Sequence, residues 1–221
     1  MFTDSKTDLI RDDRQWFIVG RWQEYEGEGR ANLLRIAGIG VFYGIELANY
    51  WTGEVDRPFH QAVTALALTW AMVGLGVLLC LAQHVFPASL KFLSTAADLV
   101  LLTAILVLAD GPKSPLVVAY FLLIVLATIR FSLGLIWFAS IGSILCYMFL
   151  LGYAKWFAER DIRVARYQQA IVLAALALTG IVLGQVIRRV RKIAVDYAAR
   201  VAADNEAAER FVVPPLGGKT G

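Results

Sequence analysis

Six apolar stretches dominate the sequence. They lie at about 33 to 51, 62 to 86, 92 to 109, 115 to 130, 133 to 151 and 169 to 187. A hydrocarbon core roughly 30 Å thick takes about 20 residues of helix to cross, and every backbone polar group inside it must be hydrogen-bonded within the protein. The stretches lack the strict polar–apolar alternation of barrel strands. The sequence therefore predicts an all-α integral membrane protein with six transmembrane helices.

The composition agrees with this class and excludes others. Hydrophobic residues make up 58% of the chain and charged residues only 18%, which is too apolar for an ordinary soluble domain. The net charge of +3 is small and the basic residues lie at segment ends, so no nucleic-acid partner is expected. Cys80 and Cys146 lie inside apolar stretches, which excludes a disulfide framework or a zinc site. We expect no metal and no cofactor.

The distribution of lysine and arginine predicts the orientation in the membrane. Most of the 21 basic residues lie in the termini and in the turns at 87 to 91 and 130 to 132, and six lie on the other face. By the positive-inside rule we expect both termini on the cytoplasmic side of the inner membrane. Four of those six charges lie between 152 and 168, so a re-entrant or five-span arrangement of that segment remains an alternative. No apolar run precedes residue 33, and no cleavable signal peptide is expected.

Residues 1 to 32 form a charged cytoplasmic segment with one aromatic pattern. Trp16, Val19, Trp22 and Tyr25 recur every three residues, which is typical of an amphipathic helix lying at the membrane interface. A solvated tail is the alternative. Gly27 and Gly29 are predicted to end this helix.

Residues 188 to 211, after the last span, predict a cytoplasmic helix. Ile187, Ala194, Val201 and Ala208 are spaced by seven, as are Val190, Tyr197, Asp204 and Phe211. This register favours either a weak coiled coil or a single solvated helix. A homodimer or a partner protein could bind there. Residues 212 to 221 are predicted to be a disordered tail, because prolines and glycines end the helix.

Four polar residues are candidates for a ligand pocket. Glu46 and Asn49 lie one turn apart in the first span, and Tyr120 and Tyr147 reach a similar depth from the fourth and fifth spans. Apolar walls with a few convergent polar groups are typical of small-molecule sites. The alternative is that an interhelical bond satisfies Glu46 and that the tyrosines are interface anchors. The ligand itself is not predicted.

Two further sets of residues bear on helix packing. Asp98 and Arg130 lie on the cytoplasmic side of the third and fourth spans, and we expect a structural ion pair between them, with a proton relay as the alternative. Gly40 and Gly44, and Gly180 and Gly184, form two Gly-x-x-x-Gly pairs that allow close helix contact. They are expected to pack within the chain, with dimerisation as the alternative.

Residues 110 to 151 resemble the membrane-embedded N-terminal regions of bacterial histidine kinases and nucleotide cyclases. The resemblance lies in Ser114-Pro115, Tyr120-Phe121 and Arg130-Phe131, set in a tight pair of helices. In those proteins the helix after the last span leads to a catalytic domain. This chain ends at Gly221 without nucleotide-binding sequence, so kinase or cyclase activity is not expected.

The resemblance implies a non-catalytic, receptor-like or regulatory membrane subunit in the bacterial inner membrane, which relays a ligand or membrane signal to a partner. Two alternatives remain. A substrate-binding or transport subunit would also need an embedded pocket, and a structural subunit of a larger membrane complex would need no ligand.

Overall fold

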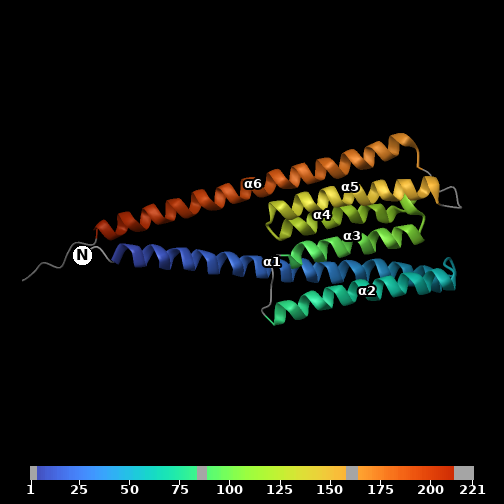
Figure 1. The fold of residues 1–221 in the computed structure, drawn as a ribbon, viewed down its shortest axis with the longest axis horizontal. Coiled ribbons are helices and arrows are strands. Elements are labelled where there is room, and N and C mark those ends of the chain that lie inside the picture. The colour runs from blue at the N-terminus through green and yellow to red at the C-terminus, as the bar shows by residue number, and fades with distance from the viewer. Residues whose placement is uncertain (1–3, 84–88, 158–163, 212–221) are drawn as a thin grey trace, which may run out of the picture. The chain divides into compact units, whose positions relative to one another are not determined.

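The computed structural model describes residues 4–83, 89–157 and 164–211, and it describes side chains within 27–83, 89–157 and 164–201 and at 203. These residues form helices and turns only, without strands. The helices in chain order (Figure 1) are α1 (Asp4–Trp51), α2 (Arg57–Ala82), α3 (Leu90–Leu108), the short 3-10 helices η1 (Gly111–Lys113) and η2 (Pro115–Val118), α4 (Ala119–Ile129), α5 (Leu133–Trp156) and α6 (Arg166–Phe211). The predicted all-helical class is confirmed.

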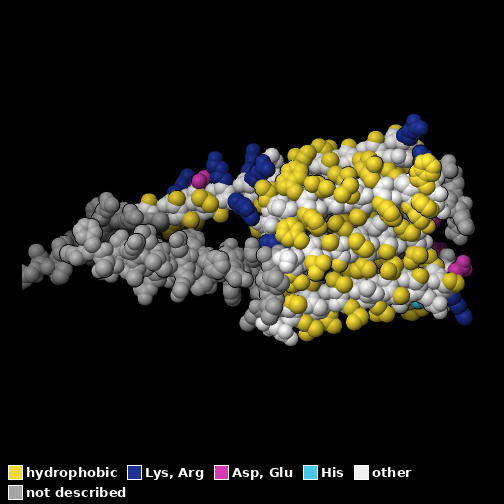
Figure 2. Space-filling model, in the orientation of Figure 1, with side chains coloured by type: hydrophobic (Ala, Val, Ile, Leu, Met, Phe, Trp, Pro, Cys, Tyr) yellow, Lys and Arg dark blue, Asp and Glu magenta, His cyan; other side chains and the backbone are white. Residues whose placement is uncertain are grey.

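Five helical segments are long and apolar enough to cross a membrane. They are Gly27–Trp51, Arg57–Ala82, Leu90–Leu108, Leu133–Trp156 and Arg166–Val201. A sixth apolar segment, Pro115–Ile129, is shorter. Hydrophobic side chains cover much of the face of the bundle in Figure 2. Such an exterior suits a lipid solvent, in which exposed apolar groups carry no penalty.

The chain divides into two compact units, residues 1–184 and 185–221. In the first unit α1 packs on α2 and α4, α2 on α3, and both α3 and α4 on α5. Gly180 of α6 lies against Ser140 of α5, at a distance that leaves no room for a Cβ. In the second unit the described residues continue α6, so the segment 188–211 is helical. Residues 212 to 221 lie outside the described residues.

The predicted helix break at Gly27 and Gly29 is wrong, because α1 continues through both glycines. Gly27 has a packing role instead: a Cβ on this residue would lie 3.2 Å from the carbonyl oxygen of Ile129 at the end of α4. The glycine therefore allows α1 and α4 to approach closely. The side chains of the aromatic pattern at 16 to 25 lie outside those described.

The turns on either side of α4 explain two of the dipeptides that carry the family resemblance. Ser114 Oγ accepts a hydrogen bond from the backbone N–H of Leu116, and Pro115 occupies the first position of η2. Both residue types are favoured at a helix start. Arg130 ends α4, and Phe131 has a φ of 49°, which turns the chain into α5.

The segment after α5 is shorter than the predicted loop at 152 to 168. α5 extends to Trp156 and α6 begins at Arg166. Residues 158 to 163, on which the re-entrant alternative depends, lie outside the described residues.

Candidate functional site

A cavity of about 480 Å³ lies along α1 at the end of the bundle where α1 turns into α2. Its wall includes Glu46 and Asn49 of α1 and Ser114, which we call the polar end of the cavity. The other wall residues are aromatic or aliphatic, apart from the phenol of Tyr43. The volume and the small number of polar groups are typical of a ligand site. Glu46 and Asn49 therefore line one cavity, and its role as a ligand site stays a prediction.

Glu46 is held by a histidine that the sequence did not assign to the pocket. His60 Nδ1 lies 3.0 and 3.1 Å from the two carboxylate oxygens of Glu46. The His60 ring stacks on Tyr50, with ring centroids 4.0 Å apart and an interplanar angle of 9°. Both Glu46 and His60 are half-buried. The carboxylate is thus fixed in position, and its lone pairs beyond those facing His60 can still accept hydrogen bonds.

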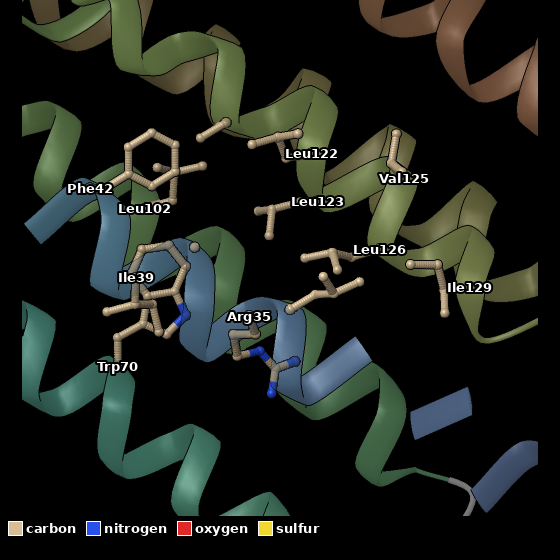
Figure 3. A pocket seen from close by; sticks show the side chains of 13 residues that line it. Arg35, Ile39, Phe42, Trp70, Leu102, Leu122, Leu123, Val125, Leu126 and Ile129 are labelled. Carbon is tan, nitrogen blue, oxygen red and sulfur yellow. The ribbon is translucent and has the colours of Figure 1, made fainter. Parts of the chain in front are cut away.

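A second cavity of about 220 Å³ continues the first toward the other end of the bundle. Ile39, Phe42, Trp70 and Leu102 line both cavities, so the two lie end to end. Figure 3 shows the side chains of α1 facing those of α4 across this second cavity. Its wall includes Leu34, Leu122 and Val125, which are exposed and apolar. The second cavity therefore opens through an apolar rim on the side of the bundle.

Arg35 and Asp98 form a buried ion pair beside this second cavity. Arg35 donates to Asp98 Oδ2 from Nε at 3.0 Å and from Nη2 at 2.7 Å. Trp70 Nε1 donates to Asp98 Oδ1 at 2.7 Å. Both carboxylate oxygens are thus hydrogen-bonded, and Trp70 contacts the cavities with its ring and the ion pair with its N–H.

The ion pair is extended to α2 by an asparagine. Arg35 Nη1 donates to Asn32 Oδ1 at 2.8 Å, and Asn32 Nδ2 donates to the carbonyl oxygen of Gly74 at 2.9 Å. Asn32 is fully buried. This chain of bonds joins α1 to both α2 and α3.

Arg130 pairs with Glu28 rather than with Asp98, which corrects the predicted ion pair. Arg130 Nη2 lies 3.0 Å from Glu28 Oε1, a contact that is close but not aligned as a hydrogen bond. Arg130 Nη1 donates to the carbonyl oxygen of Lys91 at 3.0 Å and to Thr95 Oγ1 at 2.9 Å. The ion-pair partners of Asp98 and Arg130 are thus both on α1, namely Arg35 and Glu28.

The four buried charges balance. Glu28, Arg35, Asp98 and Arg130 are each at least 95% buried and comprise two acids and two bases. Arg35 lies roughly 12 Å along α1 from Gly27, at 1.5 Å per residue, within a segment long and apolar enough to cross a membrane. Burying one member alone would cost several kcal/mol. We call these four residues with Asn32 and Trp70 the buried polar network.

Tyr120 and Tyr147 do not line the cavity, although the sequence placed them there. Tyr120 is fully buried, and its hydroxyl lies 2.8 Å from Thr103 Oγ1 of α3. Tyr147 is also fully buried, on α5. Helical rotation explains the difference: equal depth in the membrane does not place two residues on the same side of their helices.

The two Gly-x-x-x-Gly pairs have different surroundings. A Cβ at Gly180 would overlap Ser140, and one at Gly184 would lie 3.7 Å from Leu133, so this pair packs within the chain. A Cβ at Gly40 or Gly44 would meet nothing within 4 Å. Intramolecular packing therefore accounts for the pair in α6 and not for the pair in α1.

The sequence contained a signal for the residues that were missed. The inward face of α1 repeats at spacings of four and three, in the order Glu28, Asn32, Arg35, Ile39, Phe42 and Glu46, and the exposed Asn49 continues the same spacing. Spacings of four and three keep residues on one side of a helix, so this stripe indicates one continuous face with polar residues at both ends. The predicted boundary at residue 32 concealed it, because it assigned Glu28 and Asn32 to the charged segment before the first span.

The arrangement is suited to binding. Among the residues described, no group of three or more His, Cys, Asp and Glu could hold a metal ion. The cavity instead offers a fixed carboxylate, an amide and apolar walls. Comparison of the chain with protein-family models, curated proteins and solved structures finds no match.

Proposed function

We propose that the chain is a non-catalytic, receptor-like regulatory membrane subunit whose cavity binds a small molecule and whose helices relay that binding to a partner protein. The observation that supports this proposal best is the position of Trp70. Its ring lines both cavities, and its indole N–H donates to Asp98 at 2.7 Å within the buried polar network. An occupant of the cavity therefore contacts a residue that helps to hold α1, α2 and α3 together.

The free energy by which an occupant would perturb the buried polar network follows from the hydrogen bond between Trp70 and Asp98. A ligand that rotates the indole away from Asp98 leaves a buried carboxylate oxygen without its donor, at a cost of about 1–3 kcal/mol. Coupling free energies between allosteric sites have the same magnitude. Asp98 is also paired with Arg35 of α1, so the change would reach the helix that continues to Asp4.

The proposed topology has six crossings and both termini in the cytoplasm. Pro115–Ile129 is the sixth crossing and is short for a full bilayer. Four exposed basic residues lie close together on α6 just past its apolar part: Arg188, Arg189, Arg191 and Lys192. Basic residues in that position favour the cytoplasmic side. The cavity then lies in the outer half of the membrane and the buried polar network in the inner half.

The output would pass to a separate protein through the cytoplasmic part of α6, as the resemblance to sensor regions implies. Val190, Tyr197 and Val201, which belong to the seven-residue repeat, are exposed on the described part of that helix. They provide an apolar stripe for a second helix, either from a partner or from another copy of the chain.

A transport subunit is the second candidate, and one observation favours it. The larger cavity lies at the α1–α2 end, while the Arg35–Asp98 and Glu28–Arg130 pairs close the bundle toward its other end. An outward cavity above a closed inner gate would suit alternating access. In that case the bound molecule would cross the membrane.

The test is ligand-dependent stabilisation of the purified protein in lipid nanodiscs, screened against membrane and small-molecule extracts. The receptor proposal expects an extract that raises the melting temperature of the wild type and of Asp56→Asn, an exposed control, and not that of Glu46→Gln. The active extract should also change the amount of co-purified partner. Uptake of the bound compound into proteoliposomes would favour transport instead. Absence of any Glu46-dependent stabilisation would overturn both.

A further inference from the structure

The two cavities differ in chemistry along one axis, and this gradient points to the class of ligand. The larger cavity ends at Glu46, Asn49 and Ser114. The smaller one has apolar walls apart from Arg35, whose guanidinium is paired with Asp98 and Asn32. A molecule that fills both must therefore have a polar head at one end and a long apolar body.

The exposed part of the rim indicates the direction from which that molecule arrives. Leu34, Leu122 and Val125 line the smaller cavity and are exposed on helices α1 and α4. Ile45, in the wall of the larger cavity, is also exposed. Figure 3 shows the apolar side chains of α4 along this gap. Since these residues lie within apolar helical segments, the ligand would come from the hydrocarbon and not from water.

The polar end of the cavity selects the head group by charge. Glu46 provides carboxylate oxygens, and each oxygen has room for a donor besides His60 Nδ1. Asn49 adds a side-chain amide, whose oxygen accepts hydrogen bonds and whose nitrogen donates them. Ser114 Oγ accepts from Leu116 N–H. A head group that donates hydrogen bonds, such as an amine or a hydroxyl, suits these acceptors, whereas a carboxylate or phosphate would be repelled by Glu46.

From these features we propose that the cavities bind a single-chain amphiphile from the membrane, with an amine or hydroxyl head at Glu46 and Asn49 and its chain along Phe42 and Trp70 toward α4. This inference rests on the proposed function and names its ligand. It also assigns Trp70 the part of the wall that the chain of the ligand contacts.

The test uses three photoactivatable probes that share one C18 chain, carrying a diazirine at mid-chain, and that differ in head group: a primary amine, an alcohol and a carboxylate. Each is added to the protein in nanodiscs of zwitterionic lipid, and the labelled residues are mapped by mass spectrometry. The expected result is labelling at Phe42, Trp70 and the facing part of α4, by the amine and the alcohol at least ten times more than by the carboxylate. Glu46→Gln should reduce labelling by the amine at least tenfold and reduce labelling by the alcohol much less.

Annular lipid is the rival occupant, and the same experiment identifies it. Equal labelling by all three probes, or labelling of outward residues such as Met72 and Leu79 to the same extent as Phe42, would overturn the proposal. A water-soluble compound that stabilises the protein through Glu46 while the probes label only the exterior would also overturn it, yet would leave the receptor function intact. Specific labelling of the cavity without any effect on a partner would support the ligand class and contradict the proposed function.

Discussion

Replacing Asp98 tests the buried polar network, because this carboxylate accepts three hydrogen bonds in a site that is 2% exposed. Asp98→Ala removes the negative charge and leaves the Arg35 guanidinium without its counter-ion. Breaking a buried pair in this way costs about 3–5 kcal/mol. Asp98→Asn keeps one carbonyl acceptor for Trp70 or Arg35, so we expect a loss near the lower end, about 3 kcal/mol.

The measurement is the free energy of unfolding of the purified protein in mixed micelles, from titration with a denaturing detergent. Asp56→Asn is the matched control, since Asp56 is exposed and makes no side-chain cap to α2. It should change the free energy by less than about 0.5 kcal/mol. The double variant Arg35→Met/Asp98→Leu removes both charges and should recover most of the stability lost in Asp98→Ala, because a well-packed apolar pair often replaces a buried ion pair at little cost.

Two outcomes would refute this reasoning. A loss below about 1 kcal/mol in Asp98→Ala would mean that water or lipid headgroups already solvate the site. If the double variant Arg35→Met/Asp98→Leu were less stable than both Asp98→Ala and Asp98→Asn, the charges themselves would stabilise the fold.

Three further predictions use the same unfolding assay. Gly27→Ala should destabilise the protein by about 1–3 kcal/mol, because its Cβ would lie 3.2 Å from the Ile129 carbonyl oxygen. Gly29→Ala is the control and should be neutral or stabilising, because its Cβ would have nothing within 4 Å. Equal effects of the two substitutions would contradict the close packing of α1 on α4. Gly180→Ala should be destabilising, since its Cβ would overlap Ser140, and Gly40→Ala should not be unless that face of α1 is an interface between copies. Tyr120→Phe should cost about 1 kcal/mol by removing the hydrogen bond to Thr103, and no cost would show that Thr103 finds another partner.

The helical class and the approximate position of each apolar helix could be read from the sequence, because the length of each apolar stretch indicates them. The positions of Asp98 near the start of α3 and of Arg130 just after α4 followed from the same stretches. Their partners did not, because the choice between Asp98 and Glu28 for Arg130 depends on which helices are neighbours. Contacts between helices that are distant in sequence are set by packing, and local patterns do not contain them.

The two halves of the candidate site differ in how far they could be predicted. Glu46 and Asn49 were found because one helical turn separates them, so they share a face in any helix. His60 was not assigned to the pocket from the sequence, although α1 and α2 are joined by a short turn that brings it to Glu46. Arg35 lies inside the predicted first span, but its partner Asp98 is on α3, and a contact between helices distant in sequence is not visible in the local pattern. The expected break at Gly27 and Gly29 was also wrong. Glycine lowers helix propensity, but close contact with α4 outweighs that cost at Gly27.

The central claim of the proposed function is that occupancy of the cavity reaches residues 188 to 211 of α6 through Trp70. We would measure it as the maleimide labelling rate of Ala194→Cys, an exposed position on α6, in a chain whose Cys80 and Cys146 are replaced by serine. A ligand that stabilises the protein through Glu46 should change that rate at least fivefold, as a coupling of about 1–3 kcal/mol requires. In Trp70→Phe, which keeps the aromatic wall and removes the donor to Asp98, the change should fall below about twofold while binding persists. Two results would contradict the account. One is an undiminished change in labelling rate in Trp70→Phe. The other is ligand binding to the protein with Trp70 intact that leaves the labelling rate unchanged.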